Sequence, residues 1–175
     1  YVKGKIKERL EYVEPYKEPD KSWGICEVSQ QGVFLGDVVA GRDINQKYKV
    51  VHAGDLVYNP YRVNIGSIGI VPPYLDGYLA SPAYVVFYSD CEIQNYYFLT
   101  MLKLKKFQDI IMSYCLGSAR ASLPFSELER IAIPEPTNEE IKKISKLGKN
   151  LSESQQKTFG FTQGINEYSN ALIKK

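Results

Sequence analysis

Histidine is nearly absent from this chain, because His52 is the only one among 175 residues. Ser-His-Asp catalysis, Cys-His catalysis and histidine-rich metal sites would all have to use that single side chain. It lies in an apolar strand context, so we interpret it as structural. Cys26, Cys91 and Cys115 are odd in number, widely spaced and without a CxxC pair, which indicates neither a disulfide framework nor a zinc site. We expect reduced core cysteines in a cytosolic, that is cytoplasmic, protein.

Long apolar runs and a strong excess of charge are also missing. No run approaches the ~20 apolar residues of a membrane span, and no signal-peptide pattern is present, so we expect no membrane partner. The net charge of +2 is far from a histone-like excess, and local clusters of charge therefore matter more than the total. The chain begins with Tyr1 rather than Met, which we interpret as an excised fragment or a lost start.

The motifs of DNA-modifying and DNA-cleaving enzymes are incomplete. The Asn-Pro-Tyr-Arg segment at 59–62 has one proline where amino-methyltransferases use an Asn/Asp-Pro-Pro-aromatic loop, and no glycine-rich cofactor loop precedes it. A metal-dependent nuclease needs clustered carboxylates with a nearby lysine on strands. Asp20 followed by Glu27 lacks the lysine, and Glu92-Ile93-Gln94 is a looser match. We expect no catalytic residue, no metal and no cofactor. A nuclease or DNA methyltransferase domain stays open as an alternative.

Tyrosine is abundant, with 14 copies against 7 Phe and 1 Trp, and 44% of the residues are apolar. This length and composition predict one well-buried core. Tyrosine suits both half-buried strands and recognition surfaces, because it joins an apolar ring to a polar tip. A protein-interaction module with a Tyr-rich face is therefore a further alternative.

The order of patterns along the chain predicts an α/β protein of the α+β kind. Residues 1–22 are charged and proline-punctuated, and we expect a leader or linker with one short helix at 5–12. Short apolar runs at 33–35, 48–51, 56–58, 68–71 and 84–88 predict strands. A three-to-four period predicts one amphipathic helix over 94–115, and a strand is expected at 130–133. We expect a twisted, mostly antiparallel β core with one packed helix over 23–136, followed by a C-terminal helical spacer arm over 137–175.

The arm carries a narrow apolar stripe. Thr137 or Asn138 is expected to cap its first helix, and a second helical stretch follows Gly160. Steps of three, three and four separate the apolar residues of the first helix, which are Ile141, Ile144, Leu147 and Leu151. So narrow a stripe is typical of a helix that pairs with one other helix. The partner is residues 162–174 folded back, the same helix of a second copy in a homodimer, or a missing second half.

Side chains that suit base edges and phosphates gather on two glycine-containing stretches. The candidates for DNA binding are Arg42, Lys47, Lys49, Asn59, Tyr61, Arg62, Asn64, Ser118, Arg120 and Ser122. Arg62 and Arg120 lie among small polar residues rather than in apolar runs. We expect both to face one DNA-binding surface.

The order of motifs resembles the target recognition domain of type I restriction–modification specificity subunits, over residues 23–157. The motifs are Gly-Asp-Leu-Val at 54–57, Ile-Gly-Ser-Ile at 65–68, a strand at 81–88, an aromatic and leucine helix at 96–104, Gly-x-x-Arg at 117–120, Ile-Ala-Ile-Pro at 131–134 and a long helix from about 138. One departure is the Glu-Glu-Ile at 139–141, where the family often has Gln before Ile.

The resemblance implies sequence-specific recognition of double-stranded DNA by a unit that is not itself an enzyme. Methylation and cleavage would belong to a methyltransferase (modification) subunit and a restriction subunit, or to a fused adenine methyltransferase. A full specificity subunit carries two such units, and this chain carries one. It would then be half a subunit, a single-domain relative or a domain of a fusion.

Overall fold

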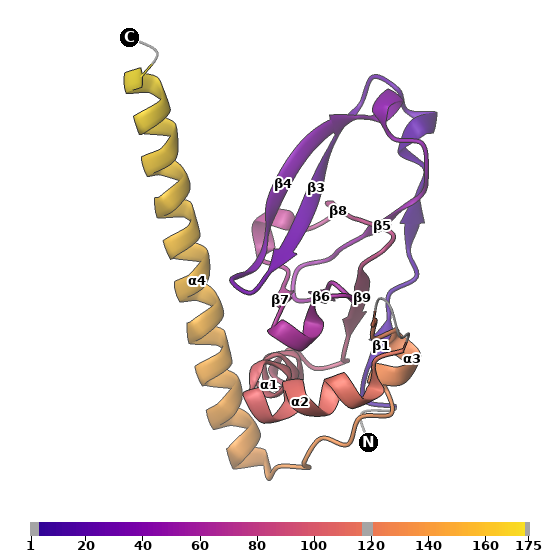
Figure 1. Ribbon diagram of the computed structural model, residues 1–175, viewed down its shortest axis with the longest axis vertical. Helices are drawn as coiled ribbons and strands as arrows, with labels where there is room; N and C mark the ends of the chain where they lie inside the picture. Colours follow the sequence, from indigo (N-terminus) through magenta and orange to yellow (C-terminus); the bar gives the residue numbers. More distant parts are fainter. Residues whose placement is uncertain (1–3, 117–120, 174–175) are drawn as a thin grey trace.

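The structure is a computed structural model that describes residues 4–116 and 121–173. Its strands form two sheets, and most of their pairings are antiparallel (Figure 1). The four-stranded sheet has the order β1 (Lys7–Glu8), β9 (Val85–Tyr88), β6 (Leu56–Tyr58), β7 (Ile68–Ile70). The five-stranded sheet has the order β2 (Tyr12–Val13), β5 (Tyr48–Val50), β8 (Leu79–Ala80), β3 (Ser22–Ser29), β4 (Gly32–Ala40), with β3 and β8 parallel.

The helices follow the strands in the sequence. They are α1 (Glu92–Lys103), α2 (Lys105–Tyr114), α3 (Phe125–Leu128) and α4 (Asn138–Ile173). Short 3₁₀ turns are η1 (Pro15–Lys17), η2 (Gly41–Asp43), η3 (Val63–Ile65) and η4 (Pro73–Leu75). The expected α+β fold with a mostly antiparallel core and a long C-terminal helix is confirmed.

The four-stranded sheet is the middle layer of the domain. Alternate residues of β6 enter different apolar clusters: Leu56 and Tyr58 face the cluster shared with α1 and α2, and Val57 faces the cluster shared with the five-stranded sheet. Val86 and Phe87 of β9 divide in the same way. A strand that is buried on both faces needs a continuous apolar run, which is why these segments could be predicted from sequence.

The N-terminal segment belongs to both sheets. The helix expected at 5–12 is wrong, because β1 pairs with β9 and β2 pairs with β5. Between these strands, Arg9 N donates to Val86 O at 2.8 Å. The open edges of β9 and β5 offer backbone partners to an extended chain, and these outweigh the weak local preference for a helix. Residues 7–13 are therefore built into the domain rather than forming a leader or linker.

Two expected elements between 94 and 134 also differ. The single helix is broken at Leu104, whose φ of −67° and ψ of 135° are extended. The spacing of apolar residues does not reveal this break, because α1 before it and α2 after it pack against the same apolar cluster. No strand forms at 130–133: Ile131 fills the core in a turn after α3, and the carbonyl of Pro134 accepts the Tyr97 hydroxyl at 2.7 Å.

Helix α4 is continuous over 36 residues and begins with a capping box. Thr137 Oγ1 accepts from Glu140 N at 3.3 Å, and the Glu140 carboxylate accepts from Thr137 N at 2.8 Å. The cap expected at Thr137 is thus confirmed, whereas no separate helix begins after Gly160. Figure 1 shows α4 running past α1 and then past the end of the β3–β4 hairpin.

Gly148 allows a close approach between α4 and α1. A Cβ at this position would lie 2.3 Å from Thr100 Oγ1 and 2.8 Å from the carbonyl oxygen of Tyr96. One turn earlier, Ser145 Oγ donates to Ile93 O at 2.6 Å. The first half of α4 is therefore docked on the domain rather than separate from it.

We expect Gly148→Ala to lower the free energy of unfolding by about 1–3 kcal/mol, because the added methyl group meets a backbone carbonyl that cannot rotate away. The gain in helix propensity, up to ~1 kcal/mol, is smaller. Urea denaturation measures the effect. Gly160→Ala is the matched control, since nothing lies within 4 Å of its Cβ position, and it should stabilise the helix. Equal stabilisation by both substitutions would contradict the close contact.

Candidate nucleic-acid interface

The loop between β6 and β7 is held by its own hydrogen bonds. Asn59 Oδ1 accepts from Tyr61 N at 3.0 Å, and Asn59 O accepts from Arg62 N at 3.0 Å. Arg62 O in turn accepts from the amides of residues 65 and 67, and Gly66 closes η3 with a φ of +82°. Tyr61 is 45% exposed at the corner of this loop, and Arg62 beside it is exposed as well. The loop presents both side chains from a fixed backbone.

Leu116, Ser122 and Leu123 lie beside this loop. Leu116 and Ser122 exchange backbone hydrogen bonds of 2.7 and 2.9 Å, and Leu123 N donates to Pro60 O at 3.0 Å. Ser122 is therefore brought next to the Tyr61 loop. Ser118 and Arg120, expected at this surface, lie outside the described residues.

A groove of about 450 Å³ lies between the Tyr61 loop, the segment 122–129 and the segment 82–85. Its lining includes Tyr61, Tyr84, Ser122 and Phe125, which offer aromatic faces and a hydroxyl group. Burial raises the pKa of Tyr84, and the positive charge of Arg62 opposes part of that rise. Arg62 is exposed next to Tyr61 and is not itself among the residues that line the groove. Aromatic faces, hydroxyl groups and a guanidinium group are the groups with which proteins contact bases and phosphates.

Lys49 lies at this groove but is 5% exposed. Its Nζ donates to Tyr84 O at 2.9 Å and lies 3.4 Å from a Glu8 carboxylate oxygen. The ammonium group of Lys49 is thus already paired within the protein, and its contact with DNA stays a prediction. Asn64 is half-buried in η3, which packs against α2.

Arg42 and Lys47 lie away from these loops, where η1 packs against η2. Figure 1 shows η1 and η2 at the top of the view, and β6 and β7 below them. Arg42 is 3.3 Å from Asp20, and Lys47 is 3.5 Å from Glu14. The structure therefore brings together Asn59, Tyr61, Arg62 and Ser122, but not these two cations.

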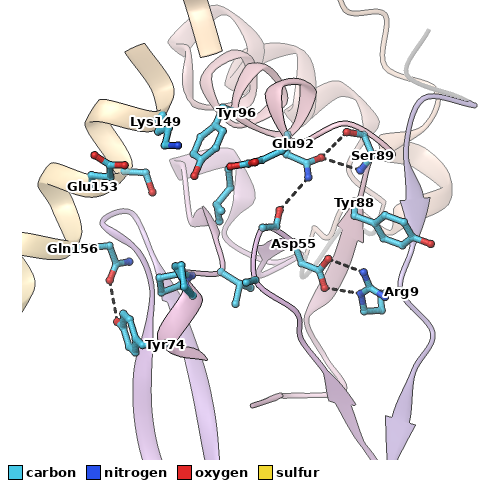
Figure 2. Close-up of a pocket in the computed structure, with 18 of the residues that line it drawn as sticks. Arg9, Asp55, Tyr74, Tyr88, Ser89, Glu92, Tyr96, Lys149, Glu153 and Gln156 are labelled. Carbon is cyan, nitrogen blue, oxygen red and sulfur yellow. Dashed lines mark hydrogen bonds and ion pairs between the residues drawn. The ribbon is translucent and has the colours of Figure 1, made fainter. Parts of the chain in front are cut away.

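The Gly-Asp motif at 54–55 lines a second, larger cleft of about 770 Å³ between α4 and the rest of the domain (Figure 2). Gly54 makes a turn with a φ of +89°, and the buried Asp55 carboxylate accepts from Arg9 Nε at 2.5 Å and from Arg9 Nη2 at 2.8 Å. Asn95 donates to Gly54 O at 3.0 Å and accepts from Ser89 N at 2.8 Å. Sequence reasoning missed Arg9 and Asn95, since nothing local marks either as the partner of this turn.

The single histidine and the cysteines contact other parts of the fold or solvent. His52 Nε2 lies 2.9 Å from Glu11 Oε2, and its Nδ1 lies 3.4 Å from Asp76 Oδ1. Burial raises the pKa of Cys26 to about 12. Cys91 is exposed, so the expectation of three core cysteines is wrong for this one.

Within the described residues there is no group of three or more His, Cys, Asp or Glu that could hold a metal ion. None of the described helices has the length and hydropathy of a membrane span.

Comparison with known proteins identifies the fold. No family model matches the chain, and no curated protein matches it. Among solved structures, it is similar to the HsdS subunit of Thermoanaerobacter tengcongensis, with a TM-score of 0.65 and 17% identity over 97% of this chain and 47% of that chain. A chain from a structural account of complex assembly and conformational transition of the type I R-M system gives a TM-score of 0.67 and 16% identity, over 98% of this chain and 48% of that one.

The chain spans about half the length of these two structures. At such low identity the likeness shows the fold, which is the one found in specificity subunits of type I restriction–modification systems. The fold expected from the order of motifs is thereby confirmed. Which residues contact DNA stays a prediction.

Proposed function

We propose that this chain is a sequence-reading, non-catalytic DNA-binding unit of a type I restriction–modification specificity protein. The observation that carries the proposal is the fold match over 97% of the chain, joined to two adjacent loops that present Tyr61, Arg62 and Ser122. The groove lined by Tyr61, Tyr84, Ser122 and Phe125 offers aromatic rings and hydroxyl groups. Arg62, next to Tyr61 in the sequence and exposed, adds a guanidinium group suited to a bidentate contact with guanine or phosphate.

The remaining partners follow from the same proposal. Catalysis belongs to a methyltransferase subunit and a restriction subunit in the cytoplasm, and this unit selects the DNA on which they act.

The apolar stripe on α4 divides into two parts. Ile144 packs against the main core, whereas Leu147 and Leu151 are 67% and 50% exposed, with Phe161 at 73% further along. These exposed residues pair α4 with a helix of a second unit, which is a second recognition unit or a second copy of this chain.

Arg62→Ala should weaken duplex binding by ~1–3 kcal/mol, about 5- to 150-fold in Kd, and relax base preference at one position, because a bidentate contact is lost. Fluorescence anisotropy on a site selected from a random duplex pool measures this effect. Arg42→Ala is the matched control, since Arg42 is already paired with Asp20, and its Kd should stay within about twofold of the parent value. Equal losses in the two variants would remove Arg62 from the interface.

Salt dependence and activity assays separate the competing functions. Affinity for duplex DNA should fall steeply with salt concentration, because phosphate contacts release counterions. A protein-interaction module would show no such duplex binding. Cleavage or methylation of DNA by the chain alone, with Mg²⁺ and a methyl donor present, would instead support a nuclease or methyltransferase.

A further inference from the structure

Helix α4 is attached to the domain at two places along its length. The first is at α1, where Ser145 bonds to Ile93 O and Gly148 lies against the Tyr96 carbonyl. The cleft shown in Figure 2 lies between α4 and the domain, and its lining includes Lys149 and Glu153. The helix then meets the domain again at the far end of this cleft, where Gln156 and Tyr74 line it. Two separated attachments fix the direction of a rod, whereas one attachment leaves it able to pivot.

The second attachment is made by two residues of α4 that we call the clamp, Gln156 and Phe159. Gln156 Nε2 donates to Val33 O of β4 at 2.7 Å, and Gln156 Oε1 accepts from the Tyr74 hydroxyl at 2.9 Å (Figure 2). The Phe159 ring stacks on the buried ring of Phe34, with 3.7 Å between centroids. One amide thus joins β4 and η4 to the helix, and an aromatic pair covers the contact.

The part of the domain that receives the clamp is itself held firmly. The β3–β4 turn is bound by Lys103 Nζ, which donates to Gln30 O at 2.9 Å, and by Ser67 Oγ, which donates to Val28 O at 3.2 Å. A Cβ on Gly69 of β7 would lie 2.7 Å from Gly32 Cα, so the two backbones are in direct contact there. The clamp therefore ties α4 to the same β7 strand that follows the Tyr61 loop.

We propose that Gln156 and Phe159 are specificity-determining positioning residues: they fix the direction of α4 relative to the DNA-reading loops, and so set the spacing of paired half-sites that the protein accepts. This inference rests on the proposed function. Ile173 lies about 38 Å from Gly148 along the helix, at a rise of ~1.5 Å per residue. A swing of about 10° at Gly148 would move that end by about 7 Å, or about two base pairs at ~3.4 Å each.

Distance measurement between two spin labels tests the clamp without DNA. Labels at Asp37→Cys on β4 and Gly160→Cys on α4, in a Cys91→Ser, Cys115→Ser background, report the angle between sheet and helix; both label sites are exposed. The parent should give one narrow distance distribution. The Gln156→Ala, Phe159→Ala variant should widen it at least twofold with its helix content retained, and Tyr74→Phe, which removes one hydrogen bond and leaves the packing, should widen it less.

Gln163→Ala is the matched control, because this glutamine lies two turns after Gln156 on the same helix and is exposed. It should leave the distribution unchanged. If the distance distribution is unchanged in both the Gln156→Ala, Phe159→Ala variant and the Tyr74→Phe variant, the clamp does not fix the helix.

The spacing role is measured with duplexes that carry two selected half-sites separated by a series of spacer lengths. The clamp variant should bind a single half-site as the parent does, while its preference for one spacing over those one or two base pairs longer or shorter falls about tenfold. A parent that binds duplexes without spacing preference, or a clamp variant that keeps the parent's preference, overturns the spacing role. If the parent binds no duplex, the proposed function is wrong. The spin-label distances would still show whether Gln156 and Phe159 hold α4 against the domain.

Discussion

Asp55→Ala is expected to destabilise the domain by about 3–5 kcal/mol, the loss associated with removing one partner of a buried ion pair. The side chain is 2% exposed and accepts three hydrogen bonds, two from Arg9 and one of 2.9 Å from His52 N. The hydrogen bonds that Arg9 donates to Asp55 raise the pKa of Arg9, so the guanidinium group stays charged. Without the carboxylate, a partly buried cation and a backbone amide lose their acceptor together.

Urea unfolding followed by circular dichroism measures this loss. Asp90→Ala is the matched control: Asp90 also pairs with a cation of β1, Lys7, at 2.8 Å, but both side chains are mostly exposed. The control should lose less than about 1 kcal/mol. If the two substitutions cost the same, the Asp55 pair is not the buried anchor of the N-terminal segment.

The partners of Asp55 show what the sequence can and cannot predict. Its own segment was recognised, because a Gly-Asp turn before the apolar run 56–58 is a local pattern. Arg9, 46 residues away, was placed in a leader because its neighbours are charged and proline-rich. The strands β1 and β2 form only because the edges of β9 and β5 are open, and no local pattern records an open edge elsewhere in the fold.

The candidate site divides in the same way. The polar loops could be predicted, since Asn, Pro and Gly between apolar runs mark exposed turns. The sequence could not predict which cations are paired within the protein. Lys49 bonds to Tyr84 O and Arg42 pairs with Asp20, and both partners are distant in the sequence. Gly148 is a further example: helix propensity marks it as a weak point, and only the position of α1 shows that it is a contact.

The overall fold was nevertheless predictable, although no family model matches the chain and the two similar structures share 16–17% identity with it. The prediction rested on the order of weak motifs along this chain rather than on any single motif. Buried strands, glycine turns and the long capped helix are each dictated by packing or backbone geometry, and these requirements persist when individual side chains change.

The largest functional effect is expected on α4, where Leu147→Lys combined with Leu151→Lys should weaken helix pairing at least about 100-fold. Burying one leucine stabilises a contact by ~1.5–3 kcal/mol, and a pair of identical helices loses four of them. Sedimentation velocity over a concentration series measures association. The parent should form a complex and the double variant should sediment as a monomer. At concentrations where the parent is also monomeric, the two should have the same unfolding midpoint, because both side chains are exposed.

Ile144→Lys separates pairing from folding. Ile144 is part of the same sequence stripe but packs against the core with α1 and the middle sheet. Its replacement should lower the free energy of unfolding by about 2–5 kcal/mol, as the loss of a core aliphatic side chain does. If instead the leucine variant unfolds the domain, or parent and leucine variant sediment alike, the exposed half of the stripe is not a pairing surface. Loss of association in the leucine variant alone would show that one helix serves both roles, with Ile144 turned to its own domain and Leu147 and Leu151 to a partner.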